Sequence, residues 1–93
     1  MPLSLLRAAV DTAVLIELRN GDTYNGTLES IDNFMNLYLH NVIHTSRDAD
    51  KFVELKQVYL RGNQIKYLRV PNEIMEKVKD DNTQHSDTAG MEQ

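Results

Sequence analysis

From Ala13 to Val70, apolar residues recur mainly at alternate positions, and turn-forming residues interrupt the alternation at short intervals. A period of two is typical of strands with one buried face, whereas helices give a period near 3.6. Asn20-Gly21-Asp22 is the clearest turn signal, because Asn-Gly readily adopts positive φ. The pattern therefore constrains most of the chain to successive short strands joined by tight turns.

The alternation divides into five predicted strands that follow one short helix. Residues 2–10 are expected to be helical, because Leu3, Leu6 and Val10 recur at helical spacing. The five strands are indicated by Val14, Ile16 and Leu18, by Tyr24, Gly26 and Leu28, by Met35, Leu37 and Leu39, by the run from Phe52 to Leu60, and by the run from Ile65 to Val70.

Two of the predicted strands change phase in the middle. Val42 is one residue out of phase with Leu39, which predicts a bulge near His40-Asn41. The fourth strand has the same slip, with Val53 and Leu55 on one parity and Val58 and Leu60 on the other. We therefore expect an all-β fold with a short N-terminal helix, in which five antiparallel strands form a strongly bent, SH3-like small barrel.

The length of 93 residues predicts a single domain. We place it at residues 1–80, ending in a short helix that starts after Pro71, and expect residues 81–93 to be an acidic, disordered tail. The chain has no cysteine, which excludes a disulfide framework and a thiolate metal site. No apolar run approaches the roughly 20 residues needed to span a bilayer, so no membrane partner is expected.

The net charge of -4 is unevenly distributed. Residues 1–70 carry as many acidic as basic side chains, so the excess of acid lies entirely in residues 71–93. A neutral body argues against broad, phosphate-driven binding of nucleic acid, which needs a basic face. It leaves room for binding that uses bases and a few charges.

Two short clusters carry groups suited to reading a uracil base. Such a base is held by stacking and by an amide on its edge, and the Asn36 amide both donates and accepts hydrogen bonds. Phe34 lies two residues away and, on an extended chain, would point toward the same base. We expect Arg61 to cover the opposite face, Gly62 to offer a free N–H to the base, and Asp32 to orient Asn36 or pair with Arg61.

Each of these residues also has a purely structural interpretation. Phe34 would serve as a core aromatic, Asp32 and Gly62 as turn residues, and Arg61 as the partner of an ion pair with Asp32. His40 and His44 invite a metal interpretation, but four residues along a strand separate them by about 13 Å, too far for one ion. No cofactor is predicted. No nucleophile–base or carboxylate pair is visible either, so we take the chain as non-enzymatic.

Two blocks of the sequence resemble a known family. The first is Asn20-Gly21-Asp22-x-Tyr24-x-Gly26-x-Leu28-x3-Asp32-x2-Met35-Asn36-x2-Leu39, and the second is Leu60-Arg61-Gly62-Asn63-Gln64-Ile65. Their order and spacing resemble the two conserved blocks of the Sm and Sm-like RNA-binding proteins, over roughly residues 2–79. Asp32-Asn33-Phe34-Met35-Asn36 and Ile65-Lys66-Tyr67-Leu68-Arg69 are most similar to the subfamily of the fourth Sm-like protein. That subfamily usually has a long tail, whereas this sequence ends in a short acidic one.

The resemblance implies a ring subunit with the Sm fold. It implies binding of uridine-rich single-stranded RNA 3′ ends through Asp32, Phe34, Asn36, Arg61 and Gly62. The RNA would be U6 small nuclear RNA in splicing, or mRNA undergoing decapping and decay, in the nucleus and cytoplasm. Other Sm-like paralogues would complete a seven-membered ring. In the absence of these paralogues, a homo-oligomer is the alternative assembly. The residues expected at the subunit interface are Val58, Leu60, Ile65, Tyr67, Leu68 and Val70.

Two alternatives within the family stay open at this point. One is a D-type spliceosomal Sm core protein, which shares both sequence blocks. The other is a mainly structural ring subunit whose RNA pocket is idle and whose protein contacts matter.

Overall fold

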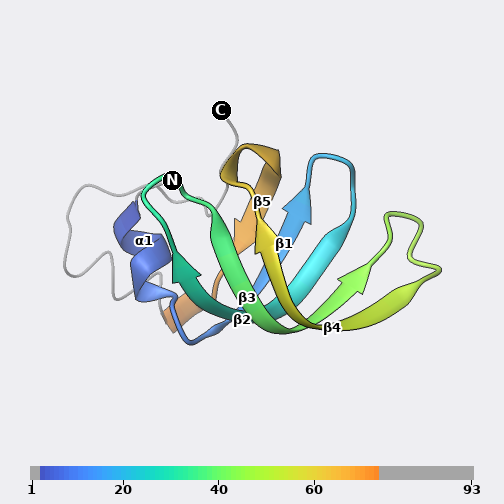
Figure 1. Cartoon of the computed structure of the whole chain (residues 1–93), viewed down its shortest axis with the longest axis horizontal. Coiled ribbons are helices and arrows are strands. Elements are labelled where there is room, and N and C mark those ends of the chain that lie inside the picture. Colours follow the sequence, from blue (N-terminus) through green and yellow to red (C-terminus); the bar gives the residue numbers. More distant parts are fainter. Residues whose placement is uncertain (1–2, 74–93) are drawn as a thin grey trace.

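A computed structural model describes residues 3–73, which form one helix and five strands (Figure 1). In chain order the elements are α1 (Leu3–Ala8), β1 (Ala13–Leu18), β2 (Thr23–Ile31), β3 (Leu37–Thr45), β4 (Phe52–Leu60), the short 3₁₀ helix η1 (Gly62–Gln64) and β5 (Ile65–Arg69). The predicted all-β class and the N-terminal helix are confirmed. Of the predicted second helix, the structure describes Asn72 and Glu73, which are helical. The remainder of that helix and the acidic tail fall on residues 74–93, outside the described residues. Within residues 3–73, no helix has the length and apolar character needed to cross a bilayer.

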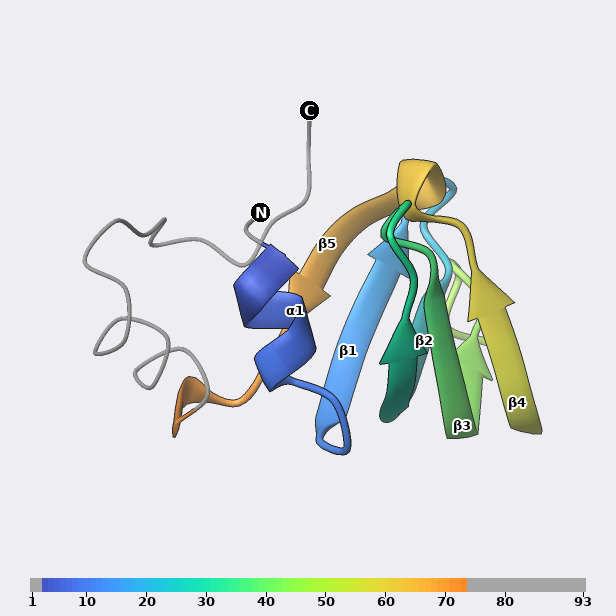
Figure 2. The ribbon, with the colours of Figure 1, turned by 60° about the vertical axis from the view of Figure 1, so that its left-hand side comes forward.

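The five strands form one antiparallel sheet in the order β4-β3-β2-β1-β5. Neighbours in the chain are neighbours in the sheet up to β4, and β5 then returns to pair with β1. Figure 2 shows how strongly the sheet curls, with α1 lying beside β1 and β5. Because β4 and β5 lie at opposite ends of the strand order, the barrel stays open and each leaves an unpaired backbone edge.

The structure contains the predicted bulge, at Asn41 in β3. Asn41 has φ of 53°, and the pairing of β2 with β3 shifts register next to Gly26. A Cβ added at Gly26 would lie 2.9 Å from Cγ2 of Val42, so β2 and β3 approach each other closely there. The pairing of β3 with β4 has no register shift. Residues that face each other on the two strands therefore change phase at matching positions.

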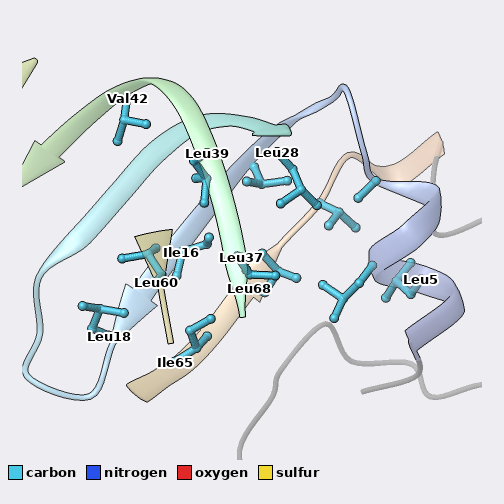
Figure 3. Close-up of a cluster of buried hydrophobic side chains, with 14 residues drawn as sticks. Leu5, Ile16, Leu18, Leu28, Leu37, Leu39, Val42, Leu60, Ile65 and Leu68 are labelled. Carbon is cyan, nitrogen blue, oxygen red and sulfur yellow. The ribbon is translucent and has the colours of Figure 1, made fainter. Parts of the chain in front are cut away.

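The core is entirely apolar and lies inside the curl of the sheet (Figure 3). Its members come from every strand and from the helix: Leu5, Leu6, Ala9, Val14, Ile16, Leu18, Leu28, Leu37, Leu39, Val42, Leu60, Ile65, Leu68 and Val70. The helix turns Leu5 and Leu6 inward, whereas Leu3 and Val10 are only partly buried. The helix therefore covers apolar residues that the open barrel would otherwise expose.

Candidate nucleic-acid interface

The segment between β2 and β3 is a tight hairpin loop. The N–H of Met35 donates to the carbonyl of Asp32 at 3.0 Å, and the N–H of Asp32 donates to the carbonyl of Asn36 at 3.1 Å. Met35 has φ of 64° and packs partly against the core just before β3 begins. The assumption that Phe34 and Asn36 lie on extended chain is therefore wrong, because the loop folds back on itself between Asp32 and Asn36.

The Asp32 carboxylate holds this loop together. One oxygen accepts the backbone N–H groups of Phe34 and Asn36, both at 2.9 Å, and the other accepts the Asn36 side-chain amide at 3.0 Å. Of the two roles expected for Asp32, the structure contains the contact with Asn36. Among residues 3–73, Asp32 forms no ion pair with Arg61. The turn-residue interpretation of Asp32 also describes real contacts, and the two roles coincide.

The Asn36 amide links this loop to the next one. Its Oδ1 accepts the N–H of Gly62 at 2.9 Å, while its Nδ2 donates to Asp32. A carboxylate only accepts and a backbone N–H only donates, so the orientation of the amide is fixed. The expectation that the Gly62 N–H is free for a base is wrong, because Asn36 occupies it.

Gly62 is required by a close approach between the two loops. A Cβ added there would lie 3.0 Å from the carbonyl carbon of Met35 and 3.1 Å from the carbonyl oxygen of Phe34, and closer still to the oxygen of Met35. Gly62 does not have positive φ, so its conformational freedom is not the reason for glycine here. The two sequence clusters, 26 residues apart from Asn36 to Gly62, thus form a single site.

The network leaves three groups open to a ligand. The Asn36 amide keeps one N–H and one lone pair beyond those used by Asp32 and Gly62. Phe34 is 83% exposed, which rules out the core-aromatic interpretation within this chain. Arg61 is exposed and forms no hydrogen bond or ion pair through its side chain with the described residues. An edge reader, an aromatic face and a guanidinium are thus available together.

The same contacts keep the Asp32 carboxyl ionised. The Asn36 N–H, with the Asn36 side chain and the Phe34 N–H, lowers the pKa of Asp32 despite the opposing effect of desolvation. A lowered pKa in the folded state means that the carboxylate stabilises the loop above the ordinary Asp pKa of about 3.9 and loses this effect as pH falls through the lowered value. An NMR titration should therefore show Asp32 protonating below the ordinary Asp pKa; a midpoint at the ordinary value would contradict the network.

One contact of this loop has no counterpart among the sequence-based expectations. Nη2 of Arg7, on α1, donates to Oδ1 of Asn33 at 3.3 Å. The sequence assigns Asn33 no role, and nothing in its local pattern connects it to a helix 26 residues earlier. The contact ties the outer side of the loop to the N-terminal helix.

The residues predicted at the subunit interface lie in two different environments. Leu60, Ile65, Leu68 and Val70 belong to the core of the chain itself, with exposures of 0–6%. Val58 is partly buried, and Tyr67 is 45% exposed on β5. β5 buries Ile65 and Leu68, whereas Lys66, Tyr67 and Arg69 are exposed in this chain. Of these six residues, Val58 and Tyr67 therefore keep side-chain surface outside the core.

His40 and His44 pair with separate carboxylates. Nδ1 of His40 lies 3.4 Å from Glu29, and Nε2 of His44 lies 3.1 Å from Asp22. His44 also stacks on Tyr24, with ring centroids 4.4 Å apart. In the part of the chain that the structure describes, no three potential metal ligands gather in one place.

The N-terminal helix, the bent five-stranded antiparallel sheet and the linked loops at one end of it define a small β-barrel of the Sm type. Residues 4–70 match the model of the LSM domain, and the chain belongs to this family. The family predicted from the two sequence blocks is confirmed, as is the Sm fold.

The similar proteins with curated names point to one subfamily. The human U6 snRNA-associated Sm-like protein LSm4 is 54% identical over 81 residues, which cover 87% of this chain and 58% of the human protein. The LSM complex subunit lsm4 of Schizosaccharomyces pombe is 47% identical over 90 residues, covering 97% of this chain and 74% of that protein. The chain thus spans little more than half the length of its human relative.

Solved structures share the fold. An Sm-like protein from Methanococcus vannielii superposes with a TM-score of 0.65 at 28% identity, covering 74% of this chain and 93% of that one. The Sm protein of Pyrococcus abyssii, solved in complex with a uridine heptamer, superposes with a TM-score of 0.66 at 21% identity and covers 76% of this chain and 99% of that one.

Proposed function

We propose that this chain is an RNA-binding subunit of an Sm-like ring, and that it holds uridine-rich single-stranded RNA through Asp32, Phe34, Asn36, Arg61 and Gly62. The observation that carries the proposal is the Asn36 amide. Asp32 and Gly62 fix its orientation, and it keeps one donor and one acceptor for a ligand. It stands in the same pair of linked loops as exposed Phe34 and Arg61.

The free groups match the chemistry of uracil. The edge of this base presents an N–H donor between two carbonyl acceptors, so the remaining N–H and lone pair of Asn36 can each find a partner. Phe34 offers a face on which a base can stack, and such stacking contributes about 1–3 kcal/mol per base. In this scheme Asp32 and Gly62 position Asn36, and Arg61 supplies a guanidinium plane or a contact with a nearby phosphate.

The free edges of β4 and β5 suit assembly into a ring. Strand edges pair readily with other strands, and pairing β4 of one subunit with β5 of the next gives a head-to-tail interface that closes by rotation. We infer a seven-membered ring completed by Sm-like paralogues. In the absence of these paralogues, the chain would form a homo-oligomer instead. The name of the Schizosaccharomyces pombe relative, an LSM complex subunit, supports assembly.

The name of the human relative, which records association with U6 snRNA, supports a nuclear role in splicing. We extend the proposal to mRNA decapping and decay in the cytoplasm, and we assign no catalytic activity. The relatives are named for the fourth Sm-like subfamily rather than for D-type Sm proteins, so the former is the assignment we favour.

Replacing Asn36 with alanine tests the proposal. The Asn36→Ala ring should assemble normally but bind oligouridine at least about tenfold more weakly, because the loss of an edge-reading hydrogen bond of about 1.4 kcal/mol corresponds to that factor. Its preference for oligouridine over oligocytidine should also fall. Fluorescence anisotropy with both oligonucleotides measures both effects.

Asn25→Ala is the matched control, because Asn25 is exposed near the start of β2, at the end of the strand away from the two loops. Parental affinity in the Asn36→Ala ring would refute the base-reading role. No oligouridine binding by the unaltered ring would favour the idle-pocket alternative instead.

A further inference from the structure

A hollow lies next to the loop site, on the other side of η1. It is lined by Leu18, Arg19, Asn20, Asn63 and Gln64. In Figure 1, η1 lies between the loop that joins β2 to β3 and the turn that joins β1 to β2. The hollow is formed where this β1–β2 turn meets η1. None of the residues assigned to RNA binding above lines it.

Arg19 is held at the hollow by two hydrogen bonds to η1 and its end. Its backbone N–H donates to the carbonyl of Gln64 at 2.9 Å, and its Nε donates to the carbonyl of Asn63 at 3.1 Å. These bonds fix the backbone and the Nε of Arg19, but they do not use the two terminal amino groups of its guanidinium. Arg19 is exposed and forms no ion pair with any carboxylate of residues 3–73.

The side chains that line the hollow favour an anionic ligand. Asn20 uses its Oδ1 to accept the N–H of Asp22 at 2.9 Å, which leaves its amide N–H groups free. Asn63 and Gln64 are exposed and carry further amides, and none of the lining residues is acidic. Two carboxylates are close in sequence, Glu17 and Asp22, and neither lines the hollow. The Asp22 carboxylate is engaged by His44 and by the backbone N–H of Arg47.

We propose that Arg19 and the surrounding amides bind a phosphate of the same RNA strand whose base occupies the Asn36 site. This inference rests on the proposed function. Asn63 follows Arg61 by two residues, a distance of at most about 7 Å along the backbone, so one strand can reach both sites. Guanidinium and amide groups are typical phosphate ligands, and such contacts position a strand without reading its sequence. The site therefore contributes affinity and not uracil preference.

The test compares Arg19→Gln with the unaltered protein in the assembled ring. Binding of oligouridine and oligocytidine should weaken by the same factor, because the substitution removes an interaction with phosphate and none with a base. The slope of log affinity against log salt should become shallower by about 0.7 for each phosphate that the ring no longer neutralises. Arg19→Lys, which retains the charge, should keep most of the slope. Thermal melting should be little changed, because the backbone bond from Arg19 to Gln64 remains.

Lys51→Gln is the matched control, because it removes one exposed positive charge next to β4, at the turn that follows β3. Equal salt slopes for Arg19→Gln and Lys51→Gln would overturn the phosphate site. A loss of uracil preference in Arg19→Gln would also overturn it, by making Arg19 a base reader. Asn36→Ala should show the opposite signature, with reduced preference and an unchanged slope. No oligouridine binding by the unaltered ring would remove the proposed function and this inference together.

Discussion

Leu68→Asp is expected to prevent the chain from folding, and not merely to separate the subunits of a ring. Leu68 is a residue of β5, is 1% exposed and points into the core. Truncating such a leucine costs about 2–5 kcal/mol, and burying an unpaired carboxylate adds several more. Small domains are stable by only about 5–15 kcal/mol, so the variant should be largely unfolded by circular dichroism and by urea titration.

Tyr67→Asp is the informative partner of this variant. Tyr67 is the adjacent residue on β5, is 45% exposed, and lies under Nζ of Lys66 at 5.2 Å from the ring centroid. A carboxylate there stays in water in the isolated chain, so the fold should survive. At the proposed seam it would place a charge against the neighbouring subunit, and light scattering should report a smaller assembly.

The pair of variants separates folding from assembly. A folded Leu68→Asp chain with a cooperative melt would contradict the burial of β5 against the core. A Tyr67→Asp chain that is folded and retains the parental mass would remove Tyr67 from the seam. The sequence alone places both residues at the interface, and only their burial distinguishes them.

Local sequence patterns predicted the elements of the fold. The alternation of Val14, Ile16 and Leu18 requires one buried face, and the structure buries all three. The phase slip after Leu39 predicted the bulge at Asn41, because a strand with one buried face can restore its register only by inserting a residue. These inferences succeed because each depends on residues that are close in the chain.

The contacts within the site could not be predicted in the same way. Local patterns indicated that Asn36 and Gly62 belong to two functional clusters, but not that one bonds the other across 26 residues. The sequence therefore suggests that the Gly62 N–H faces the ligand, whereas in the structure this N–H donates to Oδ1 of Asn36. The bond between Arg7 and Asn33 likewise depends on where the helix packs. Long-range polar contacts leave no periodic signal in a single sequence.

Gly62→Ala is expected to separate the two loops of the candidate site. The new Cβ would collide with the backbone carbonyl of Met35, and a backbone atom in a hydrogen-bonded loop cannot move aside as a flexible side chain does. Overpacking of this kind costs about 1–3 kcal/mol, and the shift would also break the bond from the Gly62 N–H to Asn36. The amide of Asn36 would lose one of its two anchors, so binding of oligouridine should fall by up to the factor expected for Asn36→Ala.

Gly26→Ala is the control for this substitution. Its Cβ would also be crowded, at 2.9 Å from Cγ2 of Val42, but in the middle of β2 and away from the site. Both variants should therefore melt at lower temperature than the parent, whereas only Gly62→Ala should shift the NMR signals of the Asn36 side-chain amide and lose RNA affinity. If Gly62→Ala bound oligouridine at parental strength, the link between the loops would not be needed to present Asn36. Asn36 would then read the base without its hydrogen bond from the Gly62 N–H, and the two loops would act independently in binding RNA.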